Sequence, residues 1–467
     1  MDRLSALDAE FLHLEDSSTH LHIAGALIFD GPTPAFDAVR DLMNAKLHLI
    51  PRYRQRVRSV PLELGRPVWC DDPHFRLDYH LRHTALPTPG GDGELCALMS
   101  RIVSQPLDRE RPLWEAWVVE GLDEQRWAFI CKVHHCLVDG MSGVDLLSVL
   151  LDLEPHASLP EAKPWEPSPE PDGVHQVADA WGGLGDDLVD RAKGLVDAVM
   201  HPGSVVETAK EFGAGLVNLA RGLQATPPLA ISGDIGPHRN WRHCSVSLDD
   251  VRTIRAAFGG TVNDVVLAVI TGGYRALLAH LGDDPDSAVV RSLVPVSTRS
   301  DDEHGIPDNR VSVILYELPV GEADPVARVA LVHEQMLERK ASHTVEAGSH
   351  LVALSNLAPP PMLGFVSRSV QSLGHRLPQR MINTVTTNVP GPQFPLYCLG
   401  SEMLEYHPFV PITTGMRVGT AILSYNGWLS IGVSSDFDSV PDTQAMVDGI
   451  ARDVSALLSA AGAAWWR

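Results

Sequence analysis

The chain has 467 residues, of which 44% are hydrophobic and 21% are charged, so its composition is that of an ordinary globular protein and excludes a disordered one. This length exceeds what one hydrophobic core usually organises, and two domains are expected. The formal net charge of -22 argues against nucleic acid or an anionic membrane surface as the main partner, because both attract basic proteins.

Six cysteines are scattered along the chain without a C-x-x-C pair, a pattern that disfavours both a zinc site and a disulfide framework. The N-terminal MDRLSALDAEFLHLED mixes charged and apolar residues, unlike a secretory signal. No stretch approaches the roughly 18 uninterrupted apolar residues of a membrane span. We therefore expect a cytoplasmic protein without a metal ion, whose contact with membranes is peripheral.

Strand-like and helix-like segments alternate from the N-terminus to about Glu154. HLHIAGALIF and RWAFICKV have the apolar content of strands, and VRDLMNAKLHLI has helical spacing. The crowded prolines of EPHASLPEAKPWEPSPEP deny backbone donors and fix φ, which predicts an extended linker. The first α/β domain is therefore placed at residues 1–170, with the linker at its end.

Residues 171–235 are expected to form a helical, amphipathic crossover segment. Apolar side chains repeat at helical spacing from Val174 to Leu223, although several glycines weaken a helix there. Two interpretations stay open: the apolar face contacts lipid, or a helix pair packs at the domain junction.

A second α/β domain is placed at residues 236–467. Capping-box spacing at Ser247–Asp250 and Thr261–Asp264 predicts that a helix begins after each. The terminal Trp465 and Trp466 either anchor at a lipid interface or pack on their own domain. Strands are expected in RHCSVSL, AVVRSLVPV, RVSVILYELPV and from Met416 to Val433, and helices around 362–381 and at the C-terminus.

The segment HHCLVDG carries the candidate reactive side chains. His134 and His135 follow a strand, and adjacent residues of an extended chain point to opposite faces, so a shared metal site is disfavoured. One imidazole is expected to enter a channel while the other is held in the body of the fold. An unperturbed imidazole titrates near pH 6.5, so its neutral form can take a proton from a hydroxyl. Asp139 can hold the loop in shape, and Gly140 permits the turn into the next helix.

HHCLVDG matches the HHxxxDG motif of the coenzyme A-dependent acyltransferase superfamily. More specifically, the chain resembles the bacterial wax ester synthase/diacylglycerol O-acyltransferase family nearly end to end. Six further blocks in the family's order leave little room for chance. These blocks are LDAEFLHLED, RPVWCDDPHF with LRHTALPTPGG, PLWE (Pro112–Glu115), VNDVVLAV (Val262–Val269), LVPVSTR and TNVPGP (Thr387–Pro392).

The resemblance implies two chloramphenicol-acetyltransferase-like α/β domains with an active-site channel at their interface. It implies acyl-CoA as co-substrate, no further cofactor, and a lipid alcohol as acceptor: diacylglycerol to give triacylglycerol, a fatty alcohol to give wax ester, or both. His135 would remove the alcohol proton as the oxygen attacks the thioester directly. Asp139 would pair with an arginine that supports the loop, with Arg54 and Arg56 as candidates. Peripheral contact with membranes or lipid droplets is also implied.

Three further polar residues have two interpretations each. Asn263 and Asp264 lie in the first turn of a predicted helix, where they cap free backbone donors or shape the channel near the histidine. Asn388 either donates a hydrogen bond to the carbonyl oxygen as negative charge develops, or is a turn residue before Pro390. Trp114 in PLWE is expected to pack or to shape a pocket, and its segment is assigned no reactive group.

Two other functions stay open on the motif alone. A condensation-domain-like transferase would take its acyl group from a carrier protein, and a non-catalytic lipid-binding or lipid-inclusion protein would use the amphipathic region as an anchor. The surrounding blocks favour the lipid family over the first, and the intact HHCLVDG counts against the second. A G-x-S-x-G elbow, a P-loop and a zincin motif are all absent from the sequence.

Overall fold

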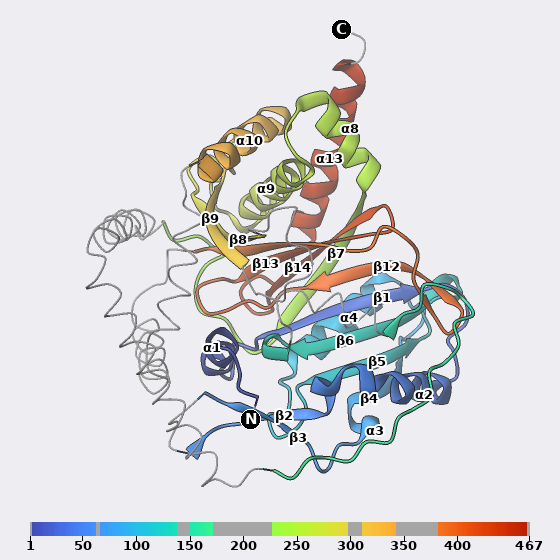
Figure 1. Ribbon diagram of the computed structural model, residues 1–467. Coiled ribbons are helices and arrows are strands. Elements are labelled where there is room, and N and C mark those ends of the chain that lie inside the picture. The colour runs from blue at the N-terminus through green and yellow to red at the C-terminus, as the bar shows by residue number, and fades with distance from the viewer. Residues whose placement is uncertain are drawn as a thin grey trace, which may run out of the picture.

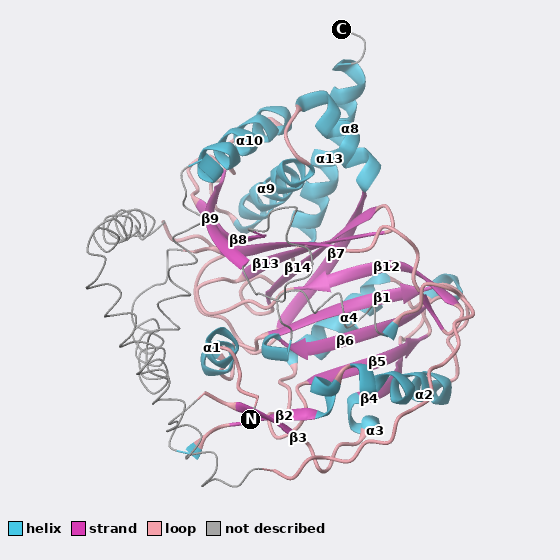
Figure 2. Ribbon diagram, in the orientation of Figure 1, coloured by secondary structure: helices cyan, strands magenta, loops and turns pink. Residues whose placement is uncertain are grey.

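Two six-stranded sheets, each with its own helices, organise the protein (Figures 1 and 2). The predicted α/β class is therefore confirmed. The computed structural model describes residues 2–61, 66–137, 150–170, 227–297, 311–341 and 382–464. The predicted helix around 362–381, most of the crossover segment and the terminal tryptophan pair lie outside these ranges.

The first lobe is built on a sheet whose strands follow one another in the order β11 (Tyr397–Cys398), β12 (Ser401–Phe409), β1 (His22–Phe29), β6 (Trp127–His134), β5 (Trp114–Glu120) and β4 (Leu81–Ala85). A small ladder joins β2 (Gln55–Arg58) to β3 (Val68–Asp71). The helices and 3-10 turns are α1 (Ala6–Leu14), α2 (Phe36–Lys46), η1 (Leu47–Leu49), η2 (Pro51–Arg54), α3 (Leu77–His80), α4 (Asp92–Ser104), η4 (Asp123–Gln125) and η5 (His135–Leu137).

The second lobe is built on a sheet with the order β7 (Arg239–Ser247), β14 (Trp428–Asp436), β13 (Val418–Tyr425), β10 (Thr384–Pro390), β8 (Val290–Ser297) and β9 (Val311–Leu318). Its helices gather on one side of that sheet (Figure 2). They are α8 (Leu248–Phe258), α9 (Val262–Leu281), α10 (Pro325–Ala341) and α13 (Gln444–Ala464). The strands and helix starts predicted within the described ranges are confirmed.

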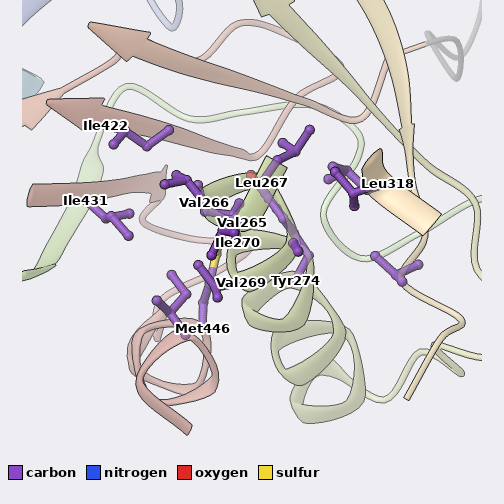
Figure 3. Packing of buried hydrophobic residues seen from close by; sticks show 14 of the residues in the cluster. Val265, Val266, Leu267, Val269, Ile270, Tyr274, Leu318, Ile422, Ile431 and Met446 are labelled. Carbon is purple, nitrogen blue, oxygen red and sulfur yellow. The ribbon is translucent and has the colours of Figure 1, made fainter. Parts of the chain in front are cut away.

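Helix α9 forms the centre of the second core (Figure 3). It begins where predicted, because the Thr261 hydroxyl accepts the amide of Asp264 and the Asp264 carboxylate accepts the amide of Thr261. Its side chains pack with Ile422 and Ile431 of the sheet and Met446 of α13. In the described part of the chain α9 alone is long and apolar enough to cross a membrane, but 72% of its apolar window is buried inside the protein.

The first sheet contains strands from the C-terminal half of the chain. β12 is one of them, and it pairs antiparallel with β1. A division into contiguous domains at 1–170, 171–235 and 236–467 does not account for this, because apolar alternation marks a strand without saying which sheet it joins. The boundaries themselves stay a prediction. The Pro-rich segment before residue 171 contains no helix or strand, as expected of an extended linker.

Helix α4 protects the open edge of the second sheet. The amides of Arg239 and Trp241 on edge strand β7 donate to the hydroxyls of Ser104 and Ser100, at 2.9 and 3.0 Å. The indole nitrogen of Trp241 donates to the Pro408 carbonyl of β12 at 3.1 Å. Unpaired edge amides are costly when buried, so these serines hold the lobes together while satisfying the strand.

Gly432 tests the contact between β14 and β12. A Cβ at this position would overlap the carbonyl oxygen of Pro408, so Gly432→Ala must push β12 aside. We expect a loss of about 1–3 kcal/mol in the free energy of unfolding, measured in urea. The matched control is Gly462→Ala in α13, where an added Cβ meets nothing within 4 Å and should stabilise the helix slightly. Equal stabilities for the two variants would contradict this packing.

Candidate active site

Strand β6 delivers two adjacent histidines to one end of the first sheet, beside α1 (Figure 1). His134 is its last residue and His135 opens the turn η5. The amide of His134 donates to the Leu113 carbonyl and that of His135 to the Leu21 carbonyl, both at 2.9 Å. Neighbouring segments on both sides therefore fix the backbone from which the imidazoles project.

The two imidazoles have different surroundings. His134 is fully buried, and its Nδ1 accepts the amide of Cys136 at 3.1 Å. Its proton must then lie on Nε2, which faces a carboxylate oxygen of Glu15 at 3.5 Å. His135 is partly exposed, and its ring centroid lies 4.2 Å from that of Phe11. His134 is thus held in the body of the fold while His135 remains reachable.

The buried carboxylate of Glu15 organises this end of the sheet. One oxygen lies 3.3 Å from Nε2 of His22, the cross-strand neighbour of His134, and accepts the amide of Leu21 at 3.1 Å. The other oxygen accepts from Arg109 at 2.6 Å. Burial raises the pKa of Glu15, but its contacts with His134 and His22 outweigh burial and hold this pKa well below its usual range. The group is therefore a fixed negative charge.

His135 is neutral near pH 7. Burial, and secondarily the nearby His134, lower its pKa to about 4. Its Nδ1 is buried and has no hydrogen-bond partner among the described residues. A neutral imidazole with a free nitrogen can take a proton from a hydroxyl brought to it.

The rest of the motif lies outside the described residues. Asp139 and Gly140 fall in the segment 138–149, so the predicted pairing of Asp139 with an arginine stays a prediction. Arg56 pairs with Glu170 of the linker at 2.7 Å. The Arg54 guanidinium lies 5.1 Å from the Trp165 ring centroid. These contacts place both arginines beneath the linker.

The structure brings the two candidate asparagines together. The Asn388 amide donates to the side-chain oxygen of Asn263 at 2.9 Å, which joins β10 to the first turn of α9. Asp264, the next residue, faces a different partner, since its carboxylate lies 2.8 Å from Nδ1 of His333 on α10. No hydrogen bond or ion pair joins either asparagine to His135 within the described ranges. The asparagine roles in chemistry therefore stay predictions.

The PLWE segment contains a buried carboxylate, Glu115, next to Trp114. Trp114 packs in the first core, and its indole donates to the Tyr53 carbonyl at 2.8 Å. Glu115 pairs with Lys132 at 3.2 Å and with Arg82 at 2.9 Å. The sequence reasoning missed Glu115, Lys132 and Glu15. One available signal was the presence of ionisable residues inside otherwise apolar strands, where such residues require partners.

A family model described as the wax ester synthase/diacylglycerol acyltransferase catalytic domain matches residues 4–266, and one for the C-terminal domain of that family matches residues 308–457. The chain belongs to the wax ester synthase/diacylglycerol acyltransferase family. The first match contains both histidines and Glu15.

Relatives and solved structures agree with membership of the wax ester synthase/diacylglycerol acyltransferase family. A Mycobacterium tuberculosis protein named as a diacylglycerol O-acyltransferase is 36% identical over 464 residues, which are 98% of this chain and 96% of its own. The structure of a family member from Marinobacter aquaeolei VT8 is 26% identical with a TM-score of 0.71, covering 99% of this chain and 100% of that one. A condensation domain of the calcium-dependent antibiotic synthetase, 18% identical with a TM-score of 0.59, covers 98% of this chain and 96% of its own and shares the fold.

The predicted family and the two-domain, chloramphenicol-acetyltransferase-like fold are confirmed. The protein is an acyltransferase, and the comparisons favour neither the carrier-protein-dependent transferase nor the non-catalytic lipid-inclusion protein. They assign no role to individual residues, so His135 and its supporting residues stay predictions.

Replacing Glu15 with Gln tests how much the negative charge of Glu15 contributes to the free energy of unfolding. A carboxyl whose pKa falls on folding stabilises the native state above its unfolded pKa, near 4.5, and loses that contribution as the pH falls. Glu15→Gln should therefore cost about 1.5–3 kcal/mol at pH 7 and progressively less between pH 5 and pH 3. Urea unfolding of both proteins across this range measures the difference. A penalty independent of pH would show that Glu15 acts through shape alone.

A double-mutant cycle tests the asparagine bridge. Asn263→Ala and Asn388→Ala remove the two ends of one hydrogen bond, so their effects on unfolding free energy should be non-additive by about 0.5–1.5 kcal/mol. Asn263→Ala combined with Asn383→Ala serves as the control. The Asn383 amide donates to Ser232 instead, so these two effects should add. Additivity in the first cycle would show that the bridge contributes nothing.

Proposed function

We propose that this acyltransferase moves the acyl group of an acyl-CoA to the hydroxyl of a lipid alcohol, diacylglycerol or a long-chain alcohol, with His135 as general base. The observation that carries the proposal is the neutral, partly exposed imidazole at the end of β6 in a chain of this family. The names of the relatives support diacylglycerol as one acceptor.

The proposed reaction forms no covalent enzyme intermediate. His135 accepts the hydroxyl proton as the alcohol oxygen attacks the thioester carbonyl carbon. The tetrahedral intermediate then collapses, the carbon–sulfur bond breaks, and the departing sulfur takes the proton back from the imidazolium. The products are the ester and free coenzyme A, and His135 is again neutral.

A channel between the lobes would let donor and acceptor approach His135 from opposite sides. Such an arrangement excludes bulk water, which would otherwise compete with the alcohol for the thioester. Asn388 is the candidate amide for stabilising the carbonyl oxygen, since its nitrogen carries a second N–H besides the one that it donates to Asn263. Contact with a membrane or lipid droplet would be peripheral and would give access to the acceptor.

His135→Ala is the direct test. Without the base, release of coenzyme A thiol from palmitoyl-CoA and an alcohol should fall by about 100- to 10,000-fold. Circular dichroism and the urea midpoint should match the wild type, because His135 makes no side-chain hydrogen bond to the described residues. A folded His135→Ala protein that retains full turnover would overturn the assignment.

The same assay identifies donor and acceptor. Diacylglycerol, hexadecanol and no acceptor are compared with palmitoyl-CoA, and palmitoyl carrier protein replaces palmitoyl-CoA in a parallel arm. Ester formation from palmitoyl-CoA with either alcohol supports the proposal. Turnover only with the carrier protein, or thiol release without ester, would contradict it.

A further inference from the structure

Strand β6 carries a buried lysine, Lys132, two residues before His134. Ile130 and Ala128 pack against α4 in an apolar cluster. Lys132, two residues further along, points to the same face because side chains alternate along a strand. Its side chain is 0% exposed. His134 follows two residues later on that face. The face therefore changes from apolar to polar towards the end of β6 that carries the two histidines.

The ammonium of Lys132 has three partners among the described residues. It donates to the carbonyls of Ile102 and Gln105 at the end of α4, at 3.0 and 2.9 Å. A helix C-terminus favours a cation. Glu115 lies 3.2 Å away on the adjacent strand, and its other oxygen binds Arg82. These contacts tie together β5, β6 and α4.

The charge of Lys132 also affects the imidazoles of His20 and His22, which form a row of rings with His134. Burial, with Lys132 among the further causes, lowers the pKa of His22 to about 4. Burial, followed by Arg239 and lastly Lys132, lowers the pKa of His20. Burial also lowers the pKa of Lys132 itself, and Glu115 and then Glu15 oppose this effect. The charged and titratable groups facing this cluster are Glu15, His20, His22, Arg82, Arg109, Glu115, His134, His135 and Arg239.

We propose that Lys132 is a positioning residue for the acyl transfer: it fixes the end of β6 and keeps the imidazoles of His20 and His22 uncharged. Two positive charges in a low-dielectric interior repel strongly, so an ammonium on this face makes protonation of His22 costly. A charged imidazole at this end of the sheet would in turn oppose the positive charge that His135 must acquire. The proposal rests on the proposed role of His135 as base.

Three substitutions separate charge from packing. Lys132→Met alone removes one of the two cations that pair with the buried Glu115, which is destabilising, so it is combined with Glu115→Gln. Lys132→Arg keeps the charge with altered geometry. Glu115→Gln alone leaves the ammonium less compensated. Lys163→Met, at an exposed position in the linker, is the matched lysine control.

The acid limb of the pH profile of kcat/KM is expected to move in opposite directions in the double variant and in Glu115→Gln. Without the cation, the imidazoles protonate more easily, so in Lys132→Met/Glu115→Gln the acid limb of kcat/KM should move up by about one pH unit. In Glu115→Gln alone the acid limb should move down, because Glu115 no longer offsets the positive charge of Lys132. Lys132→Arg and Lys163→Met should keep the wild-type limb. A purely structural role would lower rates without moving these limbs in opposite directions.

Histidine-selective 15N NMR titration provides a readout that needs no turnover. The signal of His22 is identified by its loss in His22→Gln, and its midpoint should follow the same two shifts. An unmoved midpoint in the folded double variant overturns the proposal. If that variant fails to fold, an unmoved midpoint in Glu115→Gln overturns it. A wild type without acyl transfer would refute the proposed function, and the titrations would still decide what Lys132 does.

Discussion

The active end of the first lobe depends on one constraint: polar groups buried on an apolar sheet must find their partners inside the protein. The carboxylate of Glu15 meets this constraint for several groups at once. It lies against the imidazoles of His22 and His134, accepts the Leu21 amide and pairs with Arg109. The carbonyl of Leu21 in turn accepts the amide of His135. Glu15 is therefore linked to the proposed base through the backbone of Leu21, and to the neighbouring His134 through side chains.

The lobes are joined in a way that resists separation. β12 is hydrogen-bonded into the first sheet and packs against strands of the second, while the serines of α4 satisfy the edge of β7. Moving one lobe as a rigid body would break a strand ladder and expose edge amides together. The relative placement of β6 and the second sheet is therefore a property of the fold, and a reaction between two bound substrates needs this kind of fixed geometry.

The sequence predicted the local structure well because local structure has local causes. The capping box at Thr261 and the apolar strand ending at His134 both follow from short-range patterns. The motif blocks also led to the family. The partners of the histidines were not predicted, because Glu15 and His134 are far apart along the chain and meet only when β1 and β6 pair. The membership of β12 in the first sheet was hidden for the same reason, and the described residues do not reach Asp139.

Burial of His135 poses a question about its strength as a base. The environment that keeps the imidazole neutral also makes the imidazolium expensive, since its pKa falls to about 4. If His135 is the base, proton transfer before attack would therefore create a poorly solvated cation. Transfer concerted with attack avoids this, because negative charge develops on the carbonyl oxygen as positive charge develops on His135, and the pair attract one another in a medium of low dielectric. For the proposed base, the low pKa therefore favours proton transfer concerted with attack on the thioester over proton transfer before attack.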